Sequence, residues 1–199
     1  GKKIKFCKCK DSVAELDRVL NMVEGGQVVP ALDRLAAILQ EHPDAAWALA
    51  IRGRLLLDLR EYDSLEENAD RFIRLQPSNP LALTQRAAAK LFRGEVDEAT
   101  ESMLQALTES GKEVDSFVLS VASVLAYSLA QQGVFLTARV YATLAMMATG
   151  FEGGQTAVQV LRQLNSSPTV NQMFKAIPDR IERPAGADWG ERYDEASTL

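Results

Sequence analysis

The sequence predicts an all-α fold, a right-handed α-α superhelix of about four helix pairs with a C-terminal helical cap. Similar residues recur at a spacing of 34 positions, as at Pro43 and Pro77 or Glu61 and Glu95. Hydrophobic residues make up 47% of the chain and are mostly leucine and alanine, with few alternating β-branched runs. Glycine and proline fall between apolar stretches of helical spacing. A period of this length on helical sequence indicates stacked helical hairpins.

The period continues through the middle of the chain and then lengthens once. Further pairs at the same spacing are Gly53 and Ala87, Asp63 and Asp97, Leu65 and Ala99, and Phe72 and Ala106. The next spacing is 39 residues, for Ala87 and Ala126, Gly94 and Gly133, Ala99 and Ala138, and Ala106 and Ala145. One constant offset indicates a single five-residue insertion near residues 109–113, absorbed by a longer loop or by an extended helix start.

The first unit is expected over residues 12–43, after a basic arm at 1–11 that carries five lysines. Ser12 and Glu15 have the spacing of a capping box, which predicts a helix over about 12–24 that ends at Gly25-Gly26. Pro30 falls in the first turn of the next helix, which stops at His42-Pro43.

Three further units are expected over 44–77, 78–111 and 112–150. Asp44 is the expected N-cap of the second unit, whose second helix begins near Tyr62. Asn79-Pro80 pairs a capping residue with a proline at the first helical position, and Arg93-Gly94 marks the turn within the third unit.

The remaining chain is expected to hold capping helices at 151–177 and an extended tail at 178–199. One helix covers about 155–164, and Ser167-Pro168 starts another. Trp189 and Tyr193 could begin a further helix, which suggests that the native protein continues beyond Leu199.

Charge and composition exclude some classes of partner and favour a cytoplasmic protein. The net charge is −5 and the pI is about 5.1, which argues against nucleic acid as the main ligand. The apolar runs are shorter than the roughly 20 residues of a membrane helix. Only Cys7 and Cys9 could form a disulfide, and that bond would close a loop too small to staple a fold.

Small residues recur where two antiparallel helices must pack closely, and this pattern resembles the tetratricopeptide repeat. The second unit supplies Gly53, Tyr62, Phe72 and Pro77. The third and fourth supply Ala87, Gly94, Ala99 and Ala106, and then Ala126, Gly133, Ala138 and Ala145. The resemblance covers about residues 12–150, and Leu65 and Phe72 depart from it. It implies a solenoid whose first helices line a concave, ligand-binding face.

Mapped by the period, the concave face is apolar and aromatic with one cation. The predicted protein-binding residues are Trp47, Ile51, Arg54, Leu81, Thr84, Gln85, Phe92, Val124, Tyr127 and Gln131. This lining suits an amphipathic helix or an apolar peptide and lacks the basic clamp with which some members of the family bind a C-terminal carboxylate. Two alternatives stay open. These residues could be ordinary packing beneath residues 155–176, or the tail of the same or a neighbouring molecule could fill the face, the latter making a dimer.

No arrangement of residues predicts catalysis, a cofactor or a metal. Cys7 and Cys9 supply two thiolates where structural zinc needs four ligands, and a partner would have to supply the rest. His42 lies in a turn without a nucleophile spaced for it, and Ser110-Gly111-Lys112 lacks the strand and the first glycine of a phosphate loop.

We therefore expect a non-catalytic scaffold that binds a protein partner on its concave face. One alternative is an assembly or secretion-type chaperone that shields an apolar client with the same face. The other is the interaction segment of a larger multidomain protein.

Overall fold

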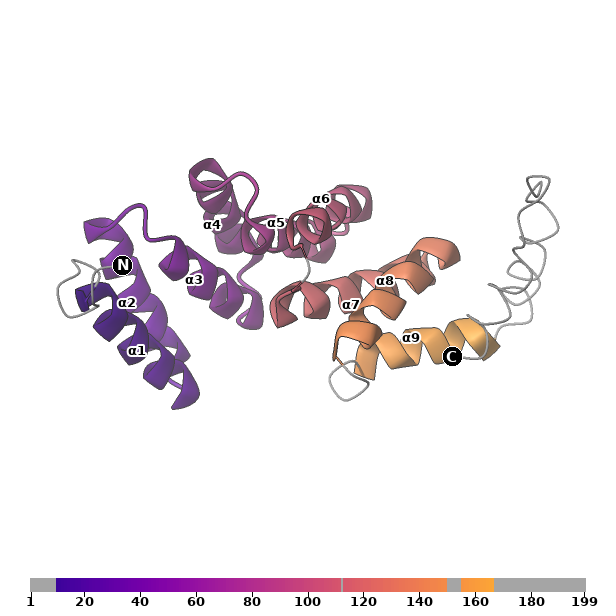
Figure 1. The fold of residues 1–199 in the computed structure, drawn as a ribbon, viewed down its shortest axis with the longest axis horizontal. Coiled ribbons are helices and arrows are strands. Elements are labelled where there is room, and N and C mark those ends of the chain that lie inside the picture. Colours follow the sequence, from indigo (N-terminus) through magenta and orange to yellow (C-terminus); the bar gives the residue numbers. More distant parts are fainter. Residues whose placement is uncertain (1–9, 112, 150–154, 167–199) are drawn as a thin grey trace.

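The computed structural model describes residues 10–111, 113–149 and 155–166, and within these ranges the regular structure is entirely helical. The helices form a curved array with α1 and α9 toward opposite ends (Figure 1). The helices are α1 (Lys10–Glu24), α2 (Val28–Glu41), α3 (Ala46–Asp58), α4 (Tyr62–Leu75), α5 (Pro80–Phe92), α6 (Val96–Glu109), α7 (Ser116–Gln131), α8 (Phe135–Thr149) and α9 (Gln155–Ser166). The all-α solenoid expected from the sequence is confirmed.

The helices pack as successive hairpins, with α5 at the centre of the array. The first helices α3, α5, α7 and α9 contact one another in that order. The second helices α4, α6 and α8 pack against their own first helices, and α4 and α6 lie along one edge of the array (Figure 1).

Tight turns inside the hairpins recur on the sequence period and require a left-handed backbone. Gly26, Gly94 and Gly133 have φ of +73°, +84° and +82°. The same turn in the second unit is made by Arg60 at φ +62°, which is the one non-glycine residue with positive φ in the described chain. Glycine adopts this conformation without the steric penalty of a Cβ atom, so Arg60 stores strain that its equivalents avoid.

Two predicted helix starts are wrong and one is confirmed. Helix α1 begins at Lys10, so Ser12 lies inside it instead of capping it, and Glu15 pairs with Arg34 of α2. Ala45, not Asp44, precedes α3, and no side chain caps that helix. Asn79 caps α5 as expected, since its Oδ1 accepts hydrogen bonds from the backbone N–H groups of the second and third residues of the helix.

The inserted residues of the fourth unit divide between the loop and the helix start. The connection from α4 to α5 spans residues 76–79, whereas that from α6 to α7 spans 110–115. Helix α5 has 13 residues and α7 has 16. Both ways of absorbing the insertion are therefore used, and Asp115 caps the lengthened α7.

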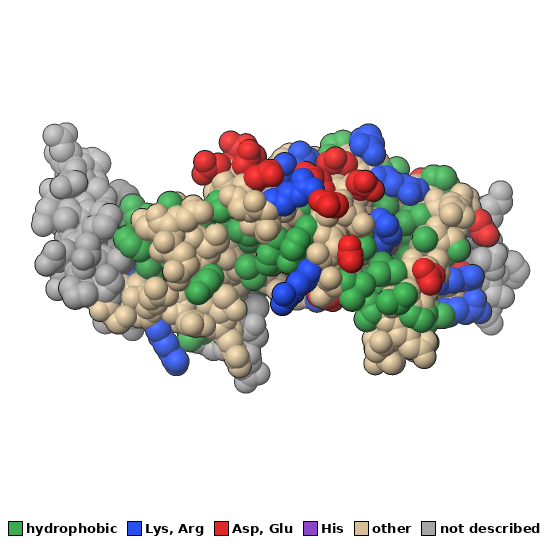
Figure 2. Space-filling model, turned by 180° about the vertical axis from the view of Figure 1, so that it is seen from behind, with side chains coloured by type: hydrophobic (Ala, Val, Ile, Leu, Met, Phe, Trp, Pro, Cys, Tyr) green, Lys and Arg blue, Asp and Glu red, His purple; other side chains and the backbone are tan. Residues whose placement is uncertain are grey.

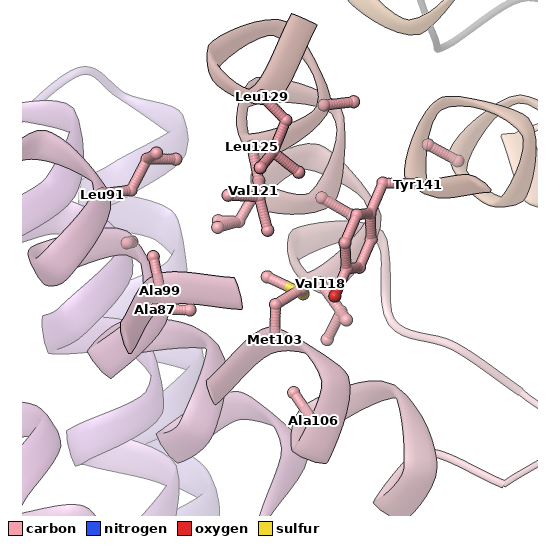
Figure 3. Packing of buried hydrophobic residues seen from close by; sticks show 14 of the residues in the cluster. Ala87, Leu91, Ala99, Met103, Ala106, Val118, Val121, Leu125, Leu129 and Tyr141 are labelled. Atoms are coloured by element: carbon pink, nitrogen blue, oxygen red, sulfur yellow. The ribbon is translucent and has the colours of Figure 1, made fainter. Parts of the chain in front are cut away.

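The core falls into two hydrophobic clusters. The N-terminal cluster gathers buried residues of α1 to α4 with Ala82. The C-terminal cluster runs from α3 and α4 through α5 to α9. In the second, Met103, Val118 and Tyr141 point toward one another between α6, α7 and α8 (Figure 3). The recurring alanines of the third and fourth units are buried, as close helix packing requires: Ala87, Ala99, Ala106, Ala126, Ala138 and Ala145.

Candidate functional site

The predicted binding surface, called the inner face below, consists of the residues of α3, α5 and α7 mapped by the period. In the structure, two residues in the middle of this surface, both on α5, are buried. Helix α5 has eight of its 13 residues buried, and Thr84 and Gln85 have no exposed surface. The Thr84 hydroxyl donates to the Pro80 carbonyl oxygen at 2.7 Å. Neither residue can contact a partner, and we remove both from the predicted surface.

Gln85 is instead the centre of a buried hydrogen-bond network that joins α3, α4 and α5. Its Nε2 donates to the carbonyl oxygens of Leu49 at 3.1 Å and Ala50 at 3.2 Å. Its Oε1 accepts from Asn68 Nδ2 at 2.8 Å, and the same Nδ2 donates to the Leu49 carbonyl at 2.9 Å. Because unpaired buried amides cost stability, these bonds fix how the third unit sits on the second.

Gly53 of α3 makes room for this network. A Cβ atom built on Gly53 would lie 2.0 to 2.2 Å from the carboxamide atoms of Gln85. Only glycine therefore allows a buried glutamine at this position of the next first helix. The equivalent of Gly53 in the third unit is Ala87, and the equivalent of Gln85 in the fourth is Val124.

Sequence reasoning missed Asn68, which completes the network on α4. Asn68 is 1% exposed, and its Oδ1 accepts from Arg52 Nη1 at 2.9 Å. Burial, together with the neighbouring charge of Arg71, lowers the pKa of the Arg52 guanidinium. The available signal was the placement of Asn68 among Leu65, Ala69 and Phe72, where a lone amide on an apolar helix face must find buried partners.

The lone cation of the inner face bridges the two helices that flank α5. The guanidinium carbon of Arg54 on α3 lies 5.8 Å from the ring centroid of Phe117 on α7, a cation–π contact. Phe117 stands in the extra first turn of α7, which the insertion provides. Arg54 itself is exposed.

The apolar residues predicted on α3 and at the start of α5 are half-buried and contribute to packing. Trp47, Ile51 and Leu81 lie against the N-terminal hydrophobic cluster. Trp47 also lines a hollow between α1, α2 and α3, where the Glu15 carboxylate accepts from Arg34 Nε at 2.6 Å.

Phe92 lies at the far end of α5 and stacks on another ring. Its centroid is 4.9 Å from that of Tyr62, with the planes 5° apart. Close by, Lys90 Nζ contacts Glu95 at 2.5 Å and Glu66 at 3.2 Å, and Arg93 pairs with Glu66. Figure 2 shows acidic and basic side chains gathered along one edge of the molecule, with hydrophobic side chains over the middle of the same face.

Helix α7 carries two exposed residues of the inner face, in addition to Arg54 on α3 and Phe92 on α5. Val124 is half-buried, whereas Tyr127 is 41% exposed and Gln131, one turn on, is exposed. The structure thus separates the inner face into an α3 strip and an α7 strip, with Thr84 and Gln85 of α5 buried between them and Phe92 exposed at the end of α5.

Metal and membrane features are absent from the described residues. Within these ranges, no group of three or more His, Cys, Asp or Glu side chains could hold a metal ion. None of the described helices combines the length and the apolar character needed to cross a bilayer. Cys7, Cys9, the predicted helix at Ser167-Pro168 and the tail with Trp189 and Tyr193 lie outside the described residues.

Comparison with known proteins identifies the fold. No family model matches the sequence, and no curated protein matches it. Among solved structures, residues 41 to the end of MamA from Desulfovibrio magneticus RS-1 match with a TM-score of 0.56 and 15% identity, covering 69% of this chain and 75% of that one.

Two other structures match over more of this chain. A crystal structure of a MamA protein has a TM-score of 0.56 and 12% identity, covering 86% of this chain and 97% of its own. A tetratricopeptide repeat protein from Parabacteroides merdae ATCC 43184 has a TM-score of 0.52 and 17% identity, covering 81% and 68%. The chain therefore has the helical-hairpin fold of the tetratricopeptide repeat proteins.

Proposed function

We propose that this chain is a non-catalytic scaffold that binds a protein partner on the open part of its inner face. The observation that carries the proposal is the exposure of Tyr127 on α7, a helix of which ten of 16 residues are buried. An aromatic side chain held on a rigid helix offers contact area at low entropic cost, which is typical of binding surfaces.

The partner that fits best is an amphipathic helix or an apolar peptide. Tyr127 and Gln131 lie one helical turn apart beside the half-buried Val124, which gives an apolar strip with a polar end. Arg54 adds a cation on the opposite strip, so an acidic residue on the partner would be complementary. The likeness to tetratricopeptide repeat structures adds support, because stacked hairpins present such faces.

The absence of a catalytic role is part of the same proposal. The buried polar side chains Asn68, Thr84 and Gln85 make hydrogen bonds within the fold, which is what structural residues do. His42 is exposed in its turn.

A helical-peptide display selection against the purified chain tests the proposal. We expect enrichment of amphipathic sequences whose binding falls at least about tenfold on Tyr127→Glu, a loss of the order seen at interface hot spots. The matched control is Gln105→Glu on the outer side of α6, which should leave binding unchanged. Equal binding by the Tyr127→Glu variant, with its helical content and melting temperature intact, would place the partner elsewhere.

A further inference from the structure

The outer face of α8 is more apolar than the equivalent positions of α6. Three exposed positions of α6 are polar, Asp97, Glu101 and Gln105, although Leu104 beside Gln105 is also exposed. The period places three apolar residues at the same positions of α8, and they are substantially exposed: Leu136 at 46%, Val140 at 57% and Leu144 at 43%. We call these three the α8 stripe. They follow one another at four-residue intervals and so form one continuous apolar ridge.

The repeat geometry itself does not explain the α8 stripe. Asp97, Glu101 and Gln105 remain exposed although the fourth hairpin packs beside the third, so a regular fifth hairpin would leave the stripe equally bare. An apolar ridge where the preceding hairpin has acidic and amide groups indicates a covering segment from outside the regular array.

The chain itself delivers a suitable segment to this place. Helix α9 packs on α8, and Arg139 Nη1 donates to Asn165 Oδ1 at 3.0 Å. Arg139 stands between Leu136 and Val140, so α9 ends beside the start of the stripe. The sequence that follows, from Ser167 to Leu199, comprises 33 residues outside the described part.

The pattern of that sequence matches the stripe. Ser167-Pro168 forms a helix-start signal, and four apolar residues follow at helical spacing: Val170, Met173, Phe174 and Ile177. The seven steps of helix from Val170 to Ile177 rise about 10 Å, and the eight steps from Leu136 to Leu144 rise about 12 Å, so the two apolar faces would have similar lengths.

We propose that residues 168–177 form a helix that docks along the α8 stripe. The alternative occupant, a second copy of the chain, needs about 800 Å² per partner for a typical stable interface. The three stripe residues and their neighbours offer far less than that. A tethered segment needs less area because its effective concentration is millimolar. This inference is independent of the proposed function of the inner face.

Hydrogen exchange of the full-length chain tests the docking. In the unaltered chain we expect the amides of 170–177 to exchange at least about tenfold more slowly than in Leu144→Asp or Phe174→Asp. The matched control is Gln105→Asp, which places the same charge at the equivalent position of α6. It should leave the protection of 170–177 unchanged.

Three results would overturn the proposal. The first is unprotected exchange of 170–177 in the unaltered chain, and the second is protection that survives both Leu144→Asp and Phe174→Asp. The third is protection that rises with protein concentration together with a dimer mass in sedimentation, which would assign the stripe to a second copy. If Leu144→Asp also speeds exchange within α7, the fold itself is disturbed, and Phe174→Asp alone then decides.

Discussion

Two neighbouring joints, or interfaces between successive units of the array, are built from equivalent helices at equivalent repeat positions, yet they are held together differently. The polar joint between the second and third units consists of Gly53, Asn68 and Gln85. The carboxamides of Asn68 and Gln85 are buried and hydrogen bonded. The equivalent positions of the apolar joint, between the third and fourth units, are Ala87, Ser102 and Val124. Directional bonds hold the first joint, and packing against the C-terminal cluster holds the second.

The difference shows how one methyl group can decide the chemistry of a joint. Without a Cβ atom at Gly53, the Gln85 side chain reaches the carbonyl oxygens of α3. Where the third unit has Ala87, the period equivalent of Gln85 on the next first helix is the apolar Val124, which packs on the same cluster. Repeat proteins can therefore vary the rigidity and register of successive hairpins while the overall pattern of small residues is preserved.

The largest expected effect comes from Gly53→Ala, which breaks the polar joint. The added methyl group displaces the Gln85 carboxamide and leaves buried amide groups unpaired. We expect the free energy of unfolding to fall by about 3 kcal/mol, even though alanine is the better helix former. Urea denaturation measures this change.

A double-mutant cycle with Gln85→Ala supplies the control. Removing the carboxamide makes space for the methyl group, so the double variant should be more stable than the sum of the two single effects predicts. Additive losses would show that the two residues do not meet.

Asn68→Ala should have the next largest effect, because it removes the shared partner of Arg52 and Gln85. We expect a loss of about 2 kcal/mol in the free energy of unfolding. Ser102→Ala at the same position of the apolar joint should change it by less than about 0.5 kcal/mol. Equal losses at the two positions would remove the distinction between the joints.

The comparison extends to the hairpin turns, where Arg60 replaces a recurring glycine. Arg60→Gly should raise the free energy of unfolding by about 1 kcal/mol because it relieves a left-handed backbone strain. Gly94→Ala at the equivalent turn should lower it by a similar amount, although nothing lies within 4 Å of the added Cβ atom. If Arg60→Gly left the free energy of unfolding unchanged or lowered it, the contacts of the Arg60 side chain would contribute at least as much stability as the backbone strain costs.

The smallest expected effect lies in the first unit, where a partly exposed ion pair, Glu15 with Arg34, takes the place of buried hydrogen bonds. The hydrogen bond from Arg34, aided by its charge, lowers the pKa of Glu15. A lowered pKa contributes stability above the ordinary pKa of the carboxyl group, and this contribution is lost as the pH falls through the lowered value. The melting temperature of Glu15→Gln should therefore lie slightly below that of the unaltered chain at neutral pH, and the two should approach each other as the pH falls from the ordinary pKa of a glutamate, about 4.3, through the lowered value. A constant difference across pH would exclude titration of Glu15 as its cause.

The sequence predicted the helices well because the signals are local and repeated. Gly26 and Gly94 mark turns between helices, and Pro80 marks a helix start. The period aligns the buried alanines. The uncapped start of α4 at Tyr62 was predicted, whereas α3 has Ala45 before it where Asp44 was expected as the cap. The carboxylate of Asp44 was available, but the helix begins one residue later and makes no such bond.

The inner face was predicted less well because it depends on how deeply each helix is recessed. The period placed Gln85 and Tyr127 on one surface, yet the structure buries the first and exposes the second. This depth follows from contacts between units, such as that of Arg54 with Phe117, which no single repeat encodes. The binding role of Tyr127, Gln131 and Arg54 stays a proposal.

Proton exchange of the side-chain amides, followed by nuclear magnetic resonance, tests the polar joint most directly. The side-chain amide protons of Asn68 and Gln85 should exchange at least about tenfold more slowly than those of the exposed Gln131. Gly53→Ala should restore fast exchange at Gln85. Exchange of Gln85 in the unaltered chain as fast as that of Gln131 would contradict the buried network and the account of the joint built on it.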